Sequence, residues 1–295
     1  MQGIIVENKS NTYSIKTKEG NLFEAVARGK FKNENLTPVV GDKVEFEILD
    51  EAKKEAVIEK IEDRSVYIKR PKMSNITQLI LVISCKHPKP DLLLLDKQLA
   101  FAELIKVKPI IVLNKIDLDN KNEFENIEKI YSKLGYKVIK TNAKENVGVE
   151  ELIKALEGEV SAFSGNSGVG KSTLINAIFE DTITLEGEIS LKNKRGKNTT
   201  TGTKLYEIEK NTFVADTPGF STFDIYEINY KELYKYFIEF YKYEEDCGFV
   251  GCSHVGENDC GIKKAVEEGK IDKQRYDNYV KIYKELKDKE DNKYR

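Results

Sequence analysis

The sequence predicts a multidomain α/β protein, and three changes of pattern along its 295 residues carry that prediction. Short apolar stretches broken by turn signals fill the first 70 residues, which favours a small β-barrel. After Pro71, buried strands alternate with helices, as in a doubly wound sheet. From Tyr226 onward, Tyr, Lys and Glu recur at helical spacing around a Cys/His cluster. We expect domains at residues 1–70, 71–225 and 226–295.

The N-terminal domain is expected to hold five short strands. They are predicted at residues 3–7, 12–17, 21–27, 43–49 and 56–61, with turns at 19–20 and 41–42. Five short strands in so small a module favour a barrel of the oligonucleotide-binding (OB) type. The alternative is a small β-domain used only for packing.

The central domain follows a regular strand and helix rhythm. Strands are predicted at residues 78–84, 109–113, 137–140 and 160–164, and helices at 92–104, 122–134, 149–156 and 171–179. Residues 205–208 and 212–215 read as a hairpin. The polar segment from about 181 to 202 has no expected structure, and a loop of that length is uncommon unless it is functional.

A glycine-rich motif lies between the strand at 160–164 and the helix that follows it. The motif reads Gly165-Asn166-Ser167-Gly168-Val169-Gly170-Lys171-Ser172. Glycines let backbone N–H groups converge on phosphate oxygens, and the helix N-terminus adds positive potential. We expect Lys171 to reach the β- and γ-phosphates of a nucleotide and Ser172 to bind Mg²⁺. Thr173, the next residue, is also expected to bind the nucleotide.

Two further motifs follow buried strands and point to guanine. The first is Asn114-Lys115-Ile116-Asp117. The Asp117 carboxylate can accept both N–H groups on the guanine edge, which adenine cannot satisfy, and the Lys115 stem can cover the base plane. The second, Asn142-Ala143-Lys144, fits a loop whose backbone amide meets the guanine oxygen. Each motif alone fits an ordinary polar loop.

The last nucleotide motif is Asp216-Thr217-Pro218-Gly219. Asp216 ends a predicted strand, so its carboxylate can approach Mg²⁺ through water, and the Gly219 N–H can approach the γ-phosphate. Upstream, Thr200 or Thr201 can complete the Mg²⁺ shell and act as a switch, and the sequence leaves open which one. A Thr-Pro-Gly turn and a solvated basic loop are the alternatives for these two segments.

The Cys/His cluster predicts a closed metal site. Three thiolates and one imidazole fall within 14 residues, in the order Cys247, Cys252, His254 and Cys260. This donor set matches tetrahedral Zn²⁺, and four protein ligands leave no position for a reacting water, so we expect a structural role. For Cys85 and His87, which lie elsewhere, core and loop positions are the simpler reading.

Composition limits the other possibilities. The formal net charge is −2, and charged residues make up 33% of the chain, so its total charge does not identify a nucleic-acid binder. Five basic residues and no acid lie between Ile189 and Lys204, however. The sequence contains no apolar run of about 18 residues and no export signal, so we expect a cytoplasmic protein without a membrane partner.

The order of the motifs, with the guanine reader about 50 residues before the phosphate loop, resembles that of the circularly permuted GTPases that act in translation. The closest resemblance is to the branch that assists small ribosomal subunit biogenesis. The resemblance also rests on Arg28-Gly29-Lys30-Phe31, the 38–42 segment, Arg70-Pro71 and the Cys/His pattern. The resemblance implies an OB barrel, a permuted GTPase domain and a zinc domain. It also implies GTP hydrolysis to GDP and phosphate, stimulated by the subunit during its late maturation. The expected partners are 16S rRNA and ribosomal proteins, bound by a monomer.

Two positions depart from patterns common in related proteins. Asn198 occupies a position where family members often carry His, so a role proposed for that His does not transfer. Phe220 follows Gly219 where many GTPases place a water-orienting Gln, and an apolar ring cannot orient water by hydrogen bonding. Slow intrinsic hydrolysis is therefore expected. The alternative is a nonenzymatic RNA-binding scaffold that uses guanine nucleotide as a structural ligand.

Overall fold

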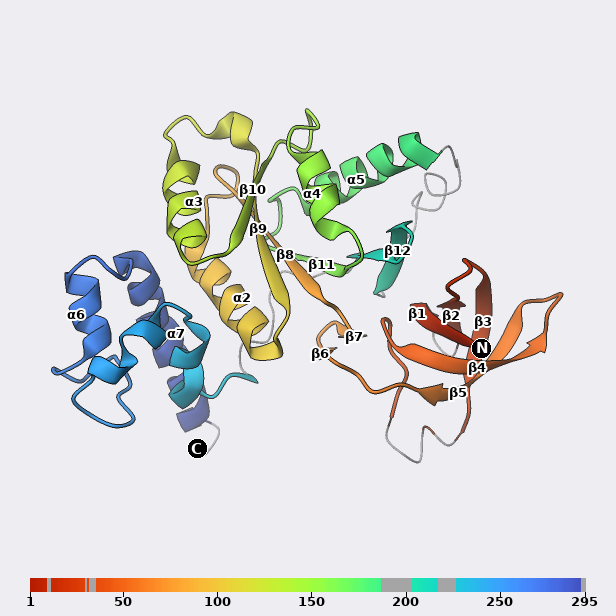
Figure 1. The fold of residues 1–295 in the computed structure, drawn as a ribbon, viewed down its shortest axis with the longest axis horizontal. Helices are drawn as coiled ribbons and strands as arrows, with labels where there is room; N and C mark the ends of the chain where they lie inside the picture. Colours follow the sequence, from red (N-terminus) through yellow and green to blue (C-terminus); the bar gives the residue numbers. More distant parts are fainter. Residues whose placement is uncertain (10–11, 30, 32–35, 187–202, 217–226, 293–295) are drawn as a thin grey trace. The chain divides into compact units, whose positions relative to one another are not determined.

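The computed structural model describes residues 1–9, 12–29, 31, 36–186, 203–216 and 227–292. The chain forms two compact units, each built from segments that are distant in sequence. Figure 1 labels the helices and strands, coloured along the sequence. Unit 1 comprises Met1–Ile80, Thr141–Ser164 and Gly170–Ser221, and unit 2 comprises Leu81–Lys140, Gly165–Val169 and Thr222–Arg295. These units do not test the expected domain boundaries at 70/71 and 225/226, which stay predictions.

Unit 1 begins with a closed five-stranded barrel. Each strand pairs with the next around a ring in the order β1-β2-β3-β5-β4 and back to β1. Alternate side chains point inward, so that residues such as Ile5, Ile15 and Phe46 are almost completely buried. The OB-type barrel predicted from the sequence is confirmed. Its strands are β1 (Gln2–Lys9), β2 (Thr12–Lys16), β3 (Leu22–Ala27), β4 (Lys43–Asp50) and β5 (Glu55–Ile61).

A buried carboxylate joins the barrel to the chain that follows it. Asp42, whose side chain is 0% exposed, accepts bonds from Nε and Nη2 of Arg64 at 2.7 and 2.8 Å and from the Ser74 hydroxyl at 2.6 Å. Ser74 ends β7 (Lys72–Ser74), which forms a hairpin with β6 (Tyr67–Lys69). Strands of three residues carry too little periodicity to be predicted, and the sequence analysis missed this hairpin.

The remaining strands of unit 1 extend the same sheet. β11 (Val160–Ser164) runs parallel to β13 (Thr212–Asp216), which forms the predicted hairpin with β12 (Lys204–Glu209). β12 in turn pairs with β1 of the barrel, where Lys204 faces Glu7 and their side chains form an ion pair at 3.1 Å. The barrel and the β12–β13 hairpin are therefore joined by backbone pairing as well as by charge.

Two helices of unit 1 complete it, and one is longer than predicted. α4 (Val149–Leu156) has the predicted bounds. α5 (Lys171–Glu186) continues seven residues beyond the expected end at Phe179, so the first residues of the segment expected to lack structure are helical. Gly187 is the first Gly or Pro after the helix begins, which explains why nothing in the sequence stops it earlier.

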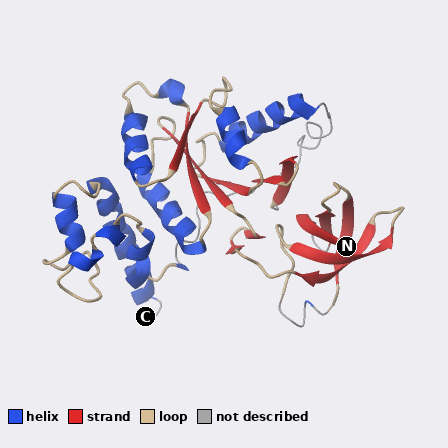
Figure 2. Ribbon diagram, in the orientation of Figure 1, coloured by secondary structure: helices blue, strands red, loops and turns tan. Residues whose placement is uncertain are grey.

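Unit 2 holds the other strands of the α/β part, in the order β10-β9-β8. Figure 2 distinguishes strands, in red, from helices, in blue. All seven residues of β8 are buried, as are the last five of β9, which confirms the prediction of strands covered on both faces. The helices α2 and α3 follow β8 and β9 in the chain. The elements are β8 (Gln78–Ser84), of which the part from Leu81 lies in unit 2, α2 (Leu92–Ile105), β9 (Lys108–Asn114), α3 (Glu123–Lys133) and β10 (Lys137–Thr141).

The C-terminal part of unit 2 is helical, as predicted, although its first half consists of short 3-10 turns. Phe237, Phe240 and Tyr279 form its core, with ring centroids 4.8–5.5 Å apart. None of the described helices is both long and apolar enough to cross a bilayer. The elements are η3 (Tyr230–Tyr236), η4 (Phe240–Lys242), η5 (Glu244–Asp246), α6 (Gly261–Glu267) and α7 (Lys273–Asp291).

A buried ion network fixes α7 against α2. Arg275, 2% exposed, donates from Nη1 to Asp96 at 2.6 Å and from Nε and Nη2 to Glu239 at 2.8 and 2.9 Å. Asn278 and Tyr131 donate to the two Asp96 oxygens at 2.7 and 2.8 Å. Burial by itself lowers the pKa of Arg275, but the two carboxylates raise it well above its ordinary value, so the guanidinium stays charged.

We expect Arg275→Ala to lower the free energy of unfolding by about 3–5 kcal/mol, because it leaves two carboxylates buried without their partner. Lys273→Ala, which removes an exposed ion pair with Asp277 on the same helix, should cost less than about 0.5 kcal/mol. Urea titrations followed by far-UV circular dichroism measure both. Equal losses would mean that the buried network contributes no more than a surface pair.

Candidate functional site

The phosphate loop joins β11 to α5, in the context that the sequence predicts. Gly165, Gly168 and Gly170 have φ angles of +142°, +82° and +101°, which other residues rarely adopt. After them, the Leu174 N–H donates to the Gly170 carbonyl at 2.9 Å and starts the helix. The loop is therefore a tight, glycine-dependent turn that leads into the N-terminus of a helix.

Gly165 also permits a close approach between backbones. A Cβ atom at this position would lie 2.2 Å from the Val82 carbonyl oxygen of β8. The position therefore requires glycine for two reasons, the backbone conformation and the missing side chain. Both residues belong to unit 2, so the start of the phosphate loop is seated directly on this strand.

The predicted guanine reader contacts the phosphate loop. Asn114, at the end of β9, is 2% exposed and donates from Nδ2 to the Val169 carbonyl at 2.9 Å. The Lys115 ammonium donates to the carbonyls of Gly168 at 2.7 Å and His87 at 2.5 Å. Two segments about 50 residues apart in the chain are thus joined within unit 2. The structure adds a role for the Lys115 charge that the sequence did not predict.

The rest of this motif forms a short turn. Lys115 adopts a left-handed conformation, with φ of +65°, and Ile116–Leu118 form the 3-10 turn η1. Asp117 lies within η1 and is exposed, so its carboxylate is available to a ligand. The bonds of Asn114 and Lys115 hold the turn that carries this carboxylate.

The loop after β10 belongs to unit 1. Asn142, 3% exposed, exchanges backbone bonds with Val147 at 3.0 and 3.1 Å, and its side chain bonds to Glu145 and to the Lys144 N–H. These bonds close a compact turn that presents Ala143 and Lys144 between them. These hydrogen bonds join residues of the loop to one another.

The start of α5 carries the predicted phosphate and Mg²⁺ ligands. Ser172 and Thr173 are exposed in the first turn, and Lys171 is partly buried. That burial lowers the pKa of the Lys171 ammonium from its ordinary value, and a neighbouring anion would stabilise its charged form. All three residues lie in unit 1.

Asp216 is placed by its strand. β13 runs parallel to β11 and pairs Ala215 with Ala162, so Asp216, its last residue, reaches the sheet edge at which the phosphate loop begins. The other residues predicted for hydrolysis lie outside the described residues. They are Thr200, Thr201 and Gly219, together with the departures Asn198 and Phe220.

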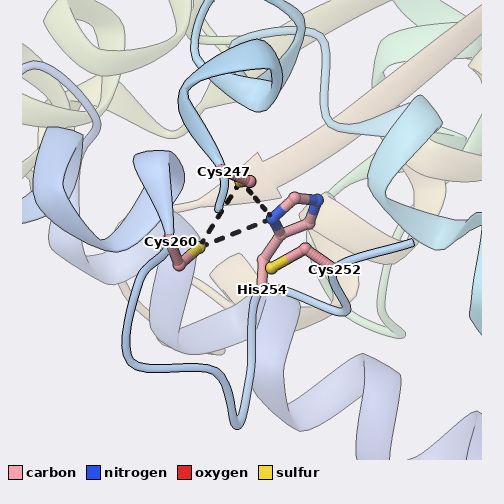
Figure 3. Close-up of side chains that lie close together, drawn as sticks. All are labelled: Cys247, Cys252, His254 and Cys260. Carbon is pink, nitrogen blue, oxygen red and sulfur yellow. Dashed lines mark hydrogen bonds between the residues drawn. The ribbon is translucent and has the colours of Figure 1, made fainter. Parts of the chain in front are cut away.

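The Cys/His cluster is assembled as predicted (Figure 3). One ligand atom from each of Cys247, Cys252, His254 and Cys260 lies within 4.8 Å of every other. The His254 Nδ1 lies 3.5 Å from the sulfurs of Cys247 and Cys260, which are 4.0 Å apart. Burial raises the pKa of Cys252 to about 12 and lowers that of His254. A divalent ion would stabilise the thiolates, which are otherwise unfavourable there, and it requires neutral imidazole.

The loop that carries these ligands is held by side chains around it. The hydroxyls of Tyr276 and Tyr279 in α7 donate to the carbonyls of His254 and Ser253 at 2.8 and 2.7 Å. The Glu257 carboxylate accepts the Ser253 N–H and hydroxyl at 2.9 and 3.0 Å. The site is therefore supported by α7, which is itself fixed to α2 through Arg275.

The sequence analysis missed the connection between β8 and α2. Pro88 approaches Gly168, where a Cβ would lie 3.6 Å from its ring, and Asp91 accepts a bond from the phosphate-loop residue Asn166 at 3.1 Å. A signal was available, because Pro-x-Pro-Asp before an apolar helical run is a helix start. Nothing in that signal indicated a contact with residue 166.

Two family models match consecutive parts of the chain between residues 2 and 226. The family model described as RsgA GTPase matches residues 61–226, and the RsgA N-terminal domain matches residues 2–58. Proteins named small ribosomal subunit biogenesis GTPase RsgA are similar over nearly their full length. That of Ruminiclostridium cellulolyticum is 40% identical, over 97% of this chain and 94% of its own, and that of Clostridium novyi is 43% identical, over 97% of each.

Solved structures show the same fold. YjeQ from Thermotoga maritima superposes with a TM-score of 0.83 at 38% identity, over 97% of this chain and 98% of its own. YloQ, described as a circularly permuted GTPase, superposes with a TM-score of 0.81 at 31% identity, over 98% and 95%. The permuted order predicted from the motifs is thus shared with structures that cover the chain from end to end.

We expect Gly165→Ala to weaken guanine-nucleotide binding about 100-fold or more, because both the positive φ and the contact with Val82 resist a side chain. Gly158→Ala is the matched control. Gly158 also has a positive φ, of +73°, but no atom lies within 4 Å of the added carbon. Titration with a fluorescent GDP derivative measures both. Similar losses would show that the approach to Val82 has no part in binding.

Proposed function

The chain belongs to the RsgA GTPase family, whose members act in small ribosomal subunit biogenesis, and on that premise we propose which of its residues hold GTP. The guanine base is read by Asn114–Asp117 and by residues 142–144, and the phosphates lie along residues 165–173. One observation carries the assignment, the bonds from Asn114 and Lys115 to the Val169 and Gly168 carbonyls. They join the base-reading turn to the phosphate loop despite the permuted order.

The family is one of GTP hydrolases, which bind guanine nucleotide and Mg²⁺. We propose that Lys171 bonds the β- and γ-phosphates and that Ser172 binds Mg²⁺ directly, with Asp216 acting through water. Gly219 is assigned the γ-phosphate contact, and Thr200 or Thr201 the switch position on Mg²⁺. The exposure of Ser172 and the position of Asp216 at the end of β13 support their two roles toward Mg²⁺.

Hydrolysis is proposed to depend on the small ribosomal subunit. Phe220 stands where many GTPases place a glutamine, and its ring offers no hydrogen bond to a water. The group that orients the attacking water, or the rearrangement that provides one, is therefore assigned to the subunit. GDP and phosphate are the products.

We expect purified small subunits to raise the GTPase rate of the wild-type protein at least about tenfold, and Lys171→Ala to abolish that increase, since the γ-phosphate charge is then unpaired. Lys154→Ala, which removes an exposed lysine of α4, is the control and should behave as wild type. Phosphate release at saturating GTP provides the measurement.

Equal wild-type rates with and without subunits would contradict the dependence on the partner. Bound GTP that is not hydrolysed even in single-turnover reactions with subunits would favour the scaffold alternative.

The Cys/His cluster is proposed to hold one structural zinc ion. Tetrahedral Zn²⁺ with sulfur at about 2.3 Å and nitrogen at about 2.0 Å separates neighbouring S and N ligands by about 3.5 Å. Both measured separations from Nδ1 of His254 to sulfur are 3.5 Å. When bound, the ion would hold Cys247, Cys252, His254 and Cys260 together and so stabilise the loop on α7.

We expect about one zinc ion per wild-type chain, and Cys252→Ser to lose most of it, because a hydroxyl is a much poorer zinc ligand than a thiolate. Cys85→Ser is the matched control, since Cys85 is also buried but lies in the β8–α2 connection. Elemental analysis after dialysis gives the metal content. Zinc retained in the Cys252 variant, or iron in place of zinc, would contradict the proposal.

The other parts of the chain are proposed to contact the partner. An OB barrel at residues 1–70 offers the kind of surface that binds oligonucleotides, and we assign it contacts with 16S rRNA. The permuted GTPase domain spans 71–225, and the zinc domain, at 226–295, is assigned contacts with rRNA and ribosomal proteins. We propose a monomer, because the expected nucleotide and metal residues all lie in one chain. We propose that it acts in the cytoplasm, because its relatives are named for small ribosomal subunit biogenesis.

A further inference from the structure

The β8–α2 connection, residues 85–91, runs alongside the phosphate loop. Its His87 carbonyl accepts the Lys115 ammonium, which also bonds the Gly168 carbonyl, and Pro88 lies next to Gly168. The Ser84 hydroxyl donates to the Pro88 carbonyl at 2.9 Å and holds the connection in shape. The phosphate loop is therefore supported from one side by a segment that the GTP assignment does not use.

Asp91 ends this connection and has two tasks. One carboxylate oxygen, Oδ1, accepts the Leu94 N–H at 2.9 Å and caps α2. The other, Oδ2, accepts the Asn166 side-chain amide at 3.1 Å. A single carboxylate thus fixes the start of a helix and a side chain in the first half of the phosphate loop.

The helix that Asp91 caps is itself immobilised. Asp96, 1% exposed and five residues further on, takes part in the buried network with Arg275, Asn278 and Tyr131. At the surface of the same helix, Lys97 bonds Glu285 of α7 at 2.5 Å. Asp91 therefore extends from a fixed support, which a residue must do if it is to position another.

The loop needs such support because its glycines make it intrinsically mobile. Three of the six residues from 165 to 170 are glycine with positive φ, and ordering them on binding costs conformational entropy. A side-chain tether that holds the loop before the ligand arrives lowers this cost and so increases affinity.

We propose that Asp91 is a positioning residue for GTP, which holds Asn166 so that the backbone N–H groups of the phosphate loop face the phosphates. This inference rests on the proposed phosphate-binding role of residues 165–173. Asp91 acts through Asn166 and does not itself contact the nucleotide.

Three variants separate the tether from the cap. Asp91→Ser keeps a good capping oxygen but is too short to reach Asn166, and Asn166→Ala removes the donor. Asp91→Asn keeps the size and one capping oxygen but replaces the acceptor for Asn166 with an amide. Asp272→Ser is the matched control, because Asp272 caps α7 in the same way, accepting the Arg275 N–H at 3.1 Å.

Fluorescent GDP titration and the subunit-stimulated GTPase rate are measured for each variant, together with the urea midpoint. We expect Asp91→Ser, Asp91→Asn and Asn166→Ala each to weaken GDP binding about tenfold, with an unchanged urea midpoint. The double variant Asp91→Ser/Asn166→Ala should bind no more weakly than either single variant, because both remove the same bond. Asp272→Ser should bind GDP as the wild type does.

Wild-type affinity in the Asp91 variants would overturn the inference while leaving the proposed function intact. Losses that add in the double variant would also overturn it, because the two side chains would then act independently. A wild-type protein that binds no guanine nucleotide would overturn the proposed function, and the inference with it.

Discussion

The proposed nucleotide site requires contact between the turn after β9 and the phosphate loop, although the two segments occur in the reverse of the usual order along the chain. The Asn114 amide and the Lys115 ammonium make this contact by donating to two phosphate-loop carbonyls. Because side chains on loops that lie close together can reach one another whatever the connectivity, the permutation changes the order of segments and leaves these contacts possible. The glycine at 165 is the complementary requirement, since it lets the loop lie against the Val82 carbonyl.

The buried ion network has a similar place in unit 2. Burying the Arg275 guanidinium is costly, and the carboxylates of Asp96 and Glu239 compensate for it by accepting its hydrogen bonds. Arg275 and Asn278 of α7 both bond Asp96 of α2, so the network fixes how the two helices pack. The same helix, α7, carries Tyr276 and Tyr279, whose hydroxyls bond the Cys/His loop. The Cys/His loop and α2 are therefore both bonded to α7.

The structure corrects the sequence analysis where side-chain and backbone contacts decide the outcome. α5 continues to Glu186, because no Gly or Pro stops it before residue 187. The β6–β7 hairpin escaped prediction because strands of three residues show no periodicity. It is instead held by Asp42, which accepts bonds from Ser74 of β7 and from Arg64. The 3-10 turns between 230 and 246 share their apolar spacing with α-helices, so spacing alone could not distinguish them.

The fold class and the permuted order of the motifs followed from the amino-acid sequence, and the residues expected to bind nucleotide and metal remain predictions from it. The spacing of glycine, lysine and serine after a strand indicates phosphate binding, and three cysteines with a histidine indicate metal binding. A buried strand such as β8 can be predicted from its apolar run. Only the tertiary structure decided that Lys115 bonds a loop carbonyl, that Asp91 reaches Asn166 and that Arg275 lies between Asp96 and Glu239. These pairs join residues up to 179 positions apart. Their formation depends on how helices pack, and local sequence carries no record of a partner so distant along the chain.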